Sequence, residues 1–461
     1  MQKEYDEEGR LILRDKYGQV LKPTSARKTT QAAKKVRNLV ARMYLEGQQA
    51  LAERKPVAWC KALGFNEFCR CLDIVPLYPE NYAGLCATKR ANMPFIEAAE
   101  ADGFSNVVCA YSRTGLGYAR TMAELGAIPP GAPDGGLARP TVMLDSPLPC
   151  DTHSKWWGIT RRYLNVPVFL IDELWVSSAD YFREDVKEHY IRYQVDQYRR
   201  LIEFLERLVG RKFDWDKFEE MESNSLKANK IYHDACEFRK AIPCPMPTED
   251  MMNIFVPSYM MRGDPETIDF YQGLYDELKY RGENKIGVIP EEKYRLIWGP
   301  GLPPWHSMGI FNWVEEQGAV FVFDLSYMSP GETPEIPKGI ADPLERMVLR
   351  QWLGRRSAIE HSVVGGYNFI HATNPLEWIE PFHADGVVFH WLRSCRHTTI
   401  GNRYYMNLIQ EHSGVPTLWL ESDICDLRDY SEVDWHSKIL AFLETVDAYR
   451  EQKKRGEVGG G

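Results

Sequence analysis

The sequence predicts an α/β fold with two doubly wound parallel sheets joined by a helical region. Short, nearly continuous apolar runs alternate with helical segments in the first and last parts of the chain, a pattern typical of parallel strands covered on both faces. Between about residues 177 and 284 these runs stop, and only long amphipathic segments occur. The two regions with alternating patterns therefore predict two α/β domains separated by helices.

Residues 1–55 are predicted to form an N-terminal extension. Residues 11–20 suit a small hairpin, and Thr29–Glu53 has the apolar spacing of a helix with one basic side. The basic residues on that side are Lys34, Lys35, Arg37 and Arg42. We interpret the basic side as a solvated helix face, with a docking surface for a partner subunit as the alternative.

The first α/β domain is predicted over residues 56–176 and the second over residues 285–455. The strands expected in the first are VAWC, DIVPLYPE, NVVCAY, TVMLDS and VPVFLID, and those in the second are KYRLIWG, AVFVFDL, DGVVFHW and PTLWLES. The helical region between the two domains covers residues 177–284, with three long helices. The tail, residues 456–461, is predicted to be disordered.

Composition excludes several classes of protein. The 461 residues are 44% hydrophobic and 26% charged, which allows a large core, and the net charge of −9 gives no basic field for nucleic acid. No apolar stretch approaches the length of about 20 residues that spans a membrane, and the polar N-terminus is not a secretory signal. Ten cysteines without such a signal indicate a cytoplasmic protein with reduced or metal-bound thiols.

Three cysteines lie at the ends of predicted strands: Cys109 in NVVCAYSR, Cys150 in DSPLPCDTH and Cys395 in HWLRSCRHT. Open α/β sheets place their ligand crevices at the carboxyl ends of strands. Converging there, three thiolates can hold three irons of a cubane cluster and leave the fourth iron open, whereas a closed zinc site normally has four ligands. Each cysteine taken alone is typical of a buried packing residue, but the three together favour a cluster.

Other patterns are weaker. Zinc is an alternative for a group of four cysteines whose spacing does not match paired C-x-x-C knuckles: Cys60, Cys69, Cys71 and Cys86. Thr114–Gly117 resembles the start of a dinucleotide loop, but Arg120 replaces the third glycine, so we interpret it as a tight turn. The chain has no G-x-x-x-x-G-K-[ST] motif, so ATP would have to be used by another polypeptide. The loop Gly299–Trp305 suits a pocket wall.

Residues beside the cysteines suggest further roles. Lys155 and Arg161 flank Trp156, and cations beside aromatic rings suit a phosphorylated ligand with an apolar part, such as an acyl-CoA. A surface helix with core tryptophans is the competing interpretation. His153 and His397 lie within three residues of Cys150 and Cys395 and can deliver protons, or can simply bond backbone carbonyls.

The chain resembles the benzoyl-CoA reductase / 2-hydroxyacyl-CoA dehydratase family from about Val57 to Glu444. The match runs through NVVCAYSR, DSPLPCDTH, RLIWGPGLPPW and GAVFVFDLSY to the C-terminal signature that begins DGVVFHWLRSCRHTTIGNRYY. Its length and N-terminal extension are most similar to the larger cluster-bearing subunit of ATP-dependent (class I) benzoyl-CoA reductases.

The resemblance implies two flavodoxin-like domains and a [4Fe-4S] cluster held by Cys109, Cys150 and Cys395, with a double-cubane cluster as an alternative. It also implies a homologous second cluster subunit, and ATPase activator subunits that carry their own iron–sulfur cluster and receive electrons from ferredoxin. The implied reaction is a Birch-like two-electron reduction of an aromatic acyl-CoA to a cyclic dienoyl-CoA. Two alternatives remain open: radical dehydration of a 2-hydroxyacyl-CoA, and a non-catalytic scaffold subunit.

Overall fold

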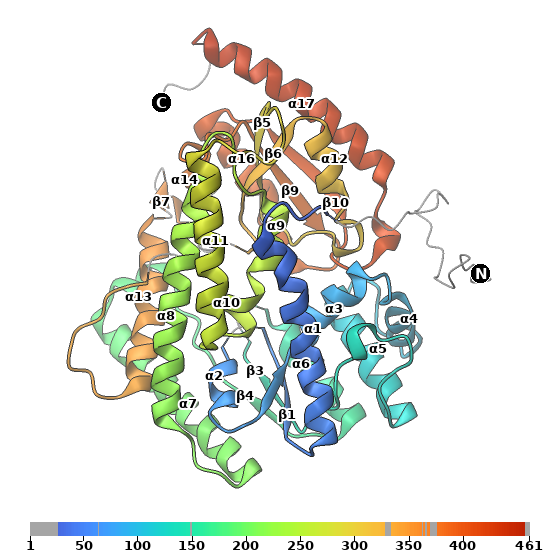
Figure 1. Ribbon diagram of the computed structural model, residues 1–461, viewed down its shortest axis with the longest axis vertical. Coiled ribbons are helices and arrows are strands. Elements are labelled where there is room, and N and C mark those ends of the chain that lie inside the picture. Colours follow the sequence, from blue (N-terminus) through green and yellow to red (C-terminus); the bar gives the residue numbers. More distant parts are fainter. Residues whose placement is uncertain are drawn as a thin grey trace.

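The computed structural model describes residues 26–62, 64–147, 150–327, 333–361, 363–364, 367–368 and 376–456. The hairpin expected at residues 11–20 and nearly all of the tail lie outside the described residues. In Figure 1 the first sheet lies in the lower half of the molecule and the second sheet in the upper half.

Each of the two large sheets has four parallel strands. The first sheet contains β1 Val57–Cys60, β2 Val75–Leu77, β3 Val142–Asp145 and β4 Val168–Leu170 in the order β2-β1-β3-β4. The second contains β5 Tyr294–Trp298, β6 Ala319–Asp324, β9 Gly386–Leu392 and β10 Thr417–Ser422 in the order β10-β9-β5-β6. Each sheet is thus parallel with non-consecutive neighbours, as in doubly wound folds. The expectation of two flavodoxin-like halves is thereby confirmed.

Helices cover both sheets, and a run of helices separates the first sheet from the second along the chain. Those of the first half are α1 Gln31–Ala52, α2 Asn66–Arg70, α3 Pro79–Thr88, α4 Met93–Ala101, α5 Ala110–Leu125 and α6 Thr152–Leu164. The middle of the chain forms α7 Glu184–Val209, α8 Trp215–Glu237, α9 Thr248–Ile254, α10 Val256–Met260 and α11 Pro265–Glu283. The second half contributes α12 Ile310–Glu316, α13 Pro343–His361, α14 Leu376–Ile379, α15 Arg396–Thr399, α16 Asn402–Ser413 and α17 Glu432–Lys454. A short antiparallel pair, β7 Val363–Val364 and β8 Tyr367–Asn368, follows α13.

Helix α1 forms because its apolar residues recur at helical spacing and its start is capped. The Thr30 side chain accepts a hydrogen bond from the Ala33 N–H, which satisfies one of the free donors of the first turn. The helix buries Val36, Leu39 and Met43 in the largest core cluster and leaves its basic residues exposed. The predicted helix over Thr29–Glu53 is therefore confirmed.

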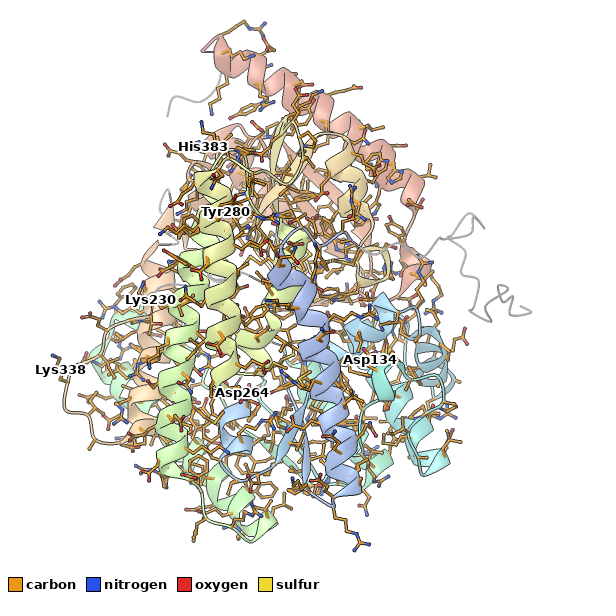
Figure 2. The ribbon with its side chains drawn as sticks, viewed as in Figure 1. Asp134, Lys230, Asp264, Tyr280, Lys338 and His383 are labelled. Atoms are coloured by element: carbon orange, nitrogen blue, oxygen red, sulfur yellow. The ribbon has the colours of Figure 1, made fainter. Side chains whose placement is uncertain are left out.

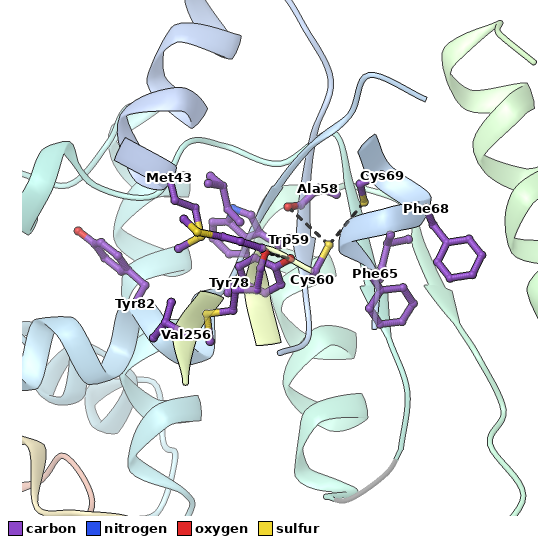
Figure 3. Packing of buried hydrophobic residues seen from close by; sticks show 14 of the residues in the cluster. Met43, Ala58, Trp59, Cys60, Phe65, Phe68, Cys69, Tyr78, Tyr82 and Val256 are labelled. Carbon is purple, nitrogen blue, oxygen red and sulfur yellow. Dashed lines mark hydrogen bonds between the residues drawn. The ribbon is translucent and has the colours of Figure 1, made fainter. Parts of the chain in front are cut away.

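The largest core cluster joins the first sheet, α1 and the helices of the middle region. Figure 3 shows Trp59 and Cys60 of β1 packed with Met43, Tyr78 and other apolar side chains. Two smaller clusters cover the two faces of the second sheet, one under α12 and α17 and the other under α14 and α16. In Figure 1 the long helices α8 and α11 run side by side. In the part of the chain that the structure describes, no helix is both long and apolar enough to cross a membrane.

Candidate functional site

A cavity of about 1040 Å³ lies where the two α/β halves meet, and all three predicted cysteines line it. Cys150 follows β3, and Cys395 follows β9. Both β3 and β9 are inner strands of their sheets, and the carboxyl ends of such strands are where α/β sheets form ligand crevices. The structure therefore brings Cys109, Cys150 and Cys395 to one place from three distant segments.

The prediction of a strand that ends at Cys109 was wrong. Residues 107–109 form no strand, and Cys109 is instead the N-cap residue of α5. Val107 is exposed, and Val108 and Cys109 are only half-buried, so the apolar run does not enter the sheet. Its β-branched residues have strand propensity, but propensity is a weak preference that packing overrides.

Helices begin at or beside all three cysteines. Cys109 and Cys395 are the N-cap residues of α5 and α15, and Cys150 precedes the N-cap residue of α6. The amide groups at a helix start favour negative charge, and thiolate is the form that binds metals. Burial nevertheless raises the pKa of Cys109 well above its usual value, and the nearby thiolates of Cys395 and Cys150 raise it further. Burial also raises the pKa of Cys395, and a charge on Cys150 would raise it further, so the three sulfurs lie close enough for their charges to interact.

Within the described residues, no three or more His, Cys, Asp or Glu side chains are close enough to hold a single metal ion. In a cubane each thiolate binds a different iron, so its cysteines stand farther apart than the ligands of one ion. The cysteine set fits a cluster in its chemistry and in its shared cavity. The four cysteines weighed for zinc are buried in the core of the first half; the sulfurs of Cys60 and Cys69 lie 3.8 Å apart (Figure 3).

A serine joins the two cysteine-bearing halves. The Ser394 hydroxyl accepts a hydrogen bond from the Ala110 N–H at 3.1 Å, and the Ser394 N–H donates to Asp423 at 3.1 Å. The buried Arg113 of α5 also donates to Asp426, beyond β10, at 2.8 Å. The chain next to Cys109 is therefore fixed to the chain next to Cys395 by polar bonds across the interface of the halves.

His153 lies in a buried polar cluster beside the carboxyl end of β3. Its Nε2 is 3.2 Å from Glu80 Oε2, its Nδ1 is 3.8 Å from Asp145 Oδ1, and its ring packs against Trp156 and Trp157. Burial alone would raise the pKa of Glu80, but the facing His153 and Lys61 lower it overall. Burial raises the pKa of Asp145 and lowers that of Lys61. His153 thus faces the Glu80 carboxylate through Nε2, and it lines the cavity, as does His397.

The residues predicted to contact an acyl-CoA divide into two groups. Trp156 is buried and lines the cavity, whereas Lys155 and Arg161 are exposed on α6 and are not among the lining residues. Lys155 pairs with Asp151 one turn earlier. The exposed positions of Lys155 and Arg161 match the competing interpretation, in which α6 is a surface helix with core tryptophans.

The tight turn expected at Thr114–Gly117 was also wrong, because these residues lie inside α5. The glycines there serve packing: a Cβ at Gly115 would lie 2.0 Å from Trp156 Cζ2, and one at Gly117 would lie 1.8 Å from the Phe95 carbonyl oxygen. Gly115 thus makes room for Trp156 beside the cavity.

Other cavity residues were partly foreseen. The loop Gly299–Trp305 was expected to suit a pocket wall, and Pro300, Gly301, Leu302 and Trp305 do line the cavity. Glu80, Lys61 and Tyr111 were missed, although Lys61 and Glu80 both follow strand ends, as Cys150 does. Burial raises the pKa of Tyr111 and Tyr327 well above the usual value, so both phenols stay protonated.

The fold and the site together define an α/β protein with a cysteine-lined cavity at the junction of two flavodoxin-like halves. Comparison with known sequences assigns the family: residues 66–446 match the family described as 2-hydroxyglutaryl-CoA dehydratase, D-component, and the chain belongs to it. The family resemblance inferred from the sequence is therefore confirmed.

Several characterised relatives cover most of this chain. The alpha subunit of (R)-2-hydroxyisocaproyl-CoA dehydratase from Clostridioides difficile is 26% identical, over 92% of this chain and 98% of the relative. The alpha subunit of lactoyl-CoA dehydratase from Anaerotignum propionicum is 24% identical, over 87% and 93%. A benzoyl-CoA reductase subunit from Thauera aromatica is 26% identical, over 84% and 87%. The relatives thus include both dehydratase and reductase subunits at similar identity.

Proposed function

We propose that this chain is the iron–sulfur subunit of an enzyme that acts on acyl-CoA thioesters, with Cys109, Cys150 and Cys395 as ligands of a [4Fe-4S] cluster. The observation that carries the proposal is that three cysteines from distant segments line one cavity. Such a cluster would supply single electrons at low potential when bound. The family membership supports the same class of substrate, because the named relatives are subunits of enzymes for acyl-CoA thioesters.

As the specific activity we propose two-electron reduction of an aromatic acyl-CoA to a cyclic dienoyl-CoA. The supporting features are the cavity's aromatic and apolar lining and the benzoyl-CoA reductase relative. The ring-bearing lining residues include Tyr111, Trp156, Phe255, Tyr259, Trp305 and Tyr327. An apolar lining excludes water, which would otherwise quench reduced species, and packs against an aromatic ring. The electrons would come from ATPase activator subunits and ferredoxin, and a homologous second subunit would complete the enzyme.

The second candidate is dehydration of a 2-hydroxyacyl-CoA, in which the electron is recycled. The observation that favours it is the presence of dehydratase alpha subunits among the relatives. Under either reaction the protein's own groups do the same work: the cysteines hold the cluster, the cavity wall orients the acyl group, and His153 holds a proton at Nε2 beside Glu80.

The first test is iron and sulfide analysis with EPR on the anaerobically purified chain and on Cys109→Ser, Cys150→Ser and Cys395→Ser. We expect about four irons per chain, lost in each variant; about eight would indicate a double-cubane cluster instead. Cys236→Ser is the matched control, because Cys236 is buried on α8 away from the cavity and should leave the iron content unchanged. One zinc, or variants that behave like the unmodified chain, would contradict the ligand assignment and favour a scaffold subunit.

The two activities are then separated by electron balance. With the activator and partner subunits present, net consumption of two electrons per product identifies the reductase. Product formation with only catalytic amounts of reductant identifies the dehydratase.

A further inference from the structure

A polar bridge made of Ser394 and Asp423 lies between the segments that carry Cys109 and Cys395. The Ser394 hydroxyl oxygen accepts a hydrogen bond from the Ala110 N–H, and the Ser394 N–H donates to Asp423, both at 3.1 Å. Ala110 directly follows Cys109, and Ser394 directly precedes Cys395. The bridge therefore uses a main-chain N–H group beside each of these two cysteines.

Asp423 is fully buried just beyond the carboxyl end of β10. One of its oxygens accepts the bond from Ser394, and the other accepts bonds from the N–H groups of Cys425 and Asp426, both at 3.2 Å. Burial raises the pKa of Asp423, but the bonds from Ser394 and the Cys425 N–H and the charge of Arg113 oppose this rise. Arg113 itself forms an ion pair with Asp426 at 2.8 Å. Three N–H donors stabilise a carboxylate in its charged form, so Asp423 places a buried negative charge at this point.

The charge of Asp423 acts on both neighbouring cysteines. Burial is the main cause of the raised pKa of Cys109 and of Cys395, and the negative charge of Asp423 adds to it in each case. The first half also has a buried carboxyl group at a strand end, Asp145, but there the His153 imidazole faces it, with Nδ1 at 3.8 Å from Oδ1. The two halves thus differ in the charge that they place beside the cavity.

Two effects of this bridge change the reduction potential of an iron–sulfur cluster in the same direction. The potential of such a cluster depends on the hydrogen bonds to its sulfurs and on the charge around it. An N–H group that donates to Ser394 or Asp423 is withdrawn from the cysteine sulfurs. A buried carboxylate also disfavours the extra negative charge that reduction brings. Both effects lower the potential.

We propose that Ser394 and Asp423 keep the reduction potential of the cluster low, as positioning residues beside the cysteines and not as ligands. The protein around a redox centre sets its electronic properties, and reduction of an aromatic acyl-CoA requires a strong reductant. The inference rests on the proposed function, since it requires the cluster held by Cys109, Cys150 and Cys395.

The test is an anaerobic redox titration of the iron-loaded chain with titanium(III) citrate and mediator dyes, followed by EPR. The variants are Asp423→Asn, which removes the charge, and Ser394→Ala, which frees the Ala110 N–H. Ser394→Thr is the conservative variant, because it keeps the hydroxyl group. Iron analysis and melting curves verify that each variant holds the cluster and remains folded.

Asp234→Asn is the control for the loss of one carboxylate. Asp234 pairs with Lys230 at 2.6 Å on α8, and Figure 2 shows Lys230 at the left of the molecule. Helix α8 contributes none of the described residues that line the cavity. This variant therefore changes the net charge by the same amount as Asp423→Asn, but at a site outside the cavity.

We expect Asp423→Asn to increase the ratio of reduced to oxidised cluster about tenfold at the midpoint potential of the unmodified chain, a rise of about 59 mV for a one-electron couple. Ser394→Ala should raise the midpoint in the same direction, and Ser394→Thr and Asp234→Asn should leave it unchanged. Unchanged midpoints in both Asp423→Asn and Ser394→Ala overturn the inference. An equal rise in Asp234→Asn also overturns it, because the loss of any carboxylate would then have the same effect.

If Asp423→Asn does not hold iron, the comparison of Ser394→Ala with Ser394→Thr decides. A raised midpoint in the alanine variant alone supports the inference, and equal midpoints overturn it. The result is also separate from the test of the proposed function. Four irons per chain with unchanged midpoints in the variants would keep the proposed cluster and remove only the role of the bridge, whereas a chain without iron would contradict the ligand assignment and this inference with it.

Discussion

At the scale of single residues, the site combines cysteines, of which Cys109 and Cys395 have a pKa raised by burial, with a histidine that has carboxyl groups on both sides. Charges on Cys395 and Cys150 raise the pKa of Cys109, so the three sulfurs lie close enough to interact. His153 lies between Glu80 and Asp145. Such an imidazole can exchange a proton with Glu80 while it faces the cavity.

We therefore hypothesise that His153 supplies a proton during turnover. His153→Gln should lower kcat by about a hundredfold or more, the usual range for loss of a general acid, and leave iron content and coenzyme A affinity unchanged. His397→Gln, measured in parallel, tests the other cavity histidine. Turnover at the unmodified rate in both variants would exclude both histidines as proton donors.

At the scale of elements, the contact between α5 and α6 shapes one wall of the cavity. Gly115 on α5 contacts Trp156 on α6, and the missing side chain at Gly115 leaves the space that this cavity-lining tryptophan occupies. On the exposed side of α6, a Cβ at Gly158 would meet nothing within 4 Å.

Replacing each of these two glycines by alanine should have opposite effects on the free energy of unfolding. Gly115→Ala should lower the free energy of unfolding by about 1–3 kcal/mol, because its methyl group displaces Trp156. Gly158→Ala should raise it by about 0.5–1 kcal/mol, because alanine favours the helix without a new contact. Urea unfolding of both variants is the measurement; a neutral Gly115→Ala would show that α6 can move away from α5 without cost.

At the scale of the whole molecule, two four-stranded parallel sheets meet around one cavity, and polar bonds join the two halves. Within the second half, the buried His390 of β9 bonds the Leu302 carbonyl oxygen through Nδ1 at 2.6 Å and the Ser422 hydroxyl through Nε2 at 2.7 Å. Burial lowers the pKa of His390 from 6.5 to about 3. A neutral imidazole is thus part of the packing beside the cavity wall.

This shift predicts how stability depends on pH. Below pH 6.5 His390 is protonated in the unfolded chain, but in the folded chain it stays neutral until the pH approaches 3. Its contribution to the unfolding free energy therefore falls as pH drops towards 3. Between about pH 4 and 6 the slope of unfolding free energy against pH should be less positive in His390→Gln than in the unmodified chain by about 1.4 kcal/mol per pH unit. Above about pH 7.5 the two slopes should agree. Identical slopes over the acidic range would mean that His390 is protonated in the folded chain.

The sequence by itself determined the class of fold, most strands, the helix of the N-terminal extension and the family. These features depend on local apolar periodicity and on linear motifs, which a single chain displays directly. It also singled out the three cysteines, although for Cys109 the reason was wrong: the run NVVCAY has the pattern of a strand, and only packing shows that its residues stay outside the sheet.

Only the tertiary structure decided which residues share the cavity. Glu80, Lys61 and Tyr111 come from separate segments, and Lys155 and Arg161 look equally suitable in sequence but are not part of its lining. Likewise, Lys34, Lys35 and Arg37 are all exposed cations of α1, but Lys34 and Arg37 line the cavity and Lys35 does not. The physical reason is that strand and helix periodicity fixes which face a residue occupies, whereas the packing of distant elements fixes what that face meets.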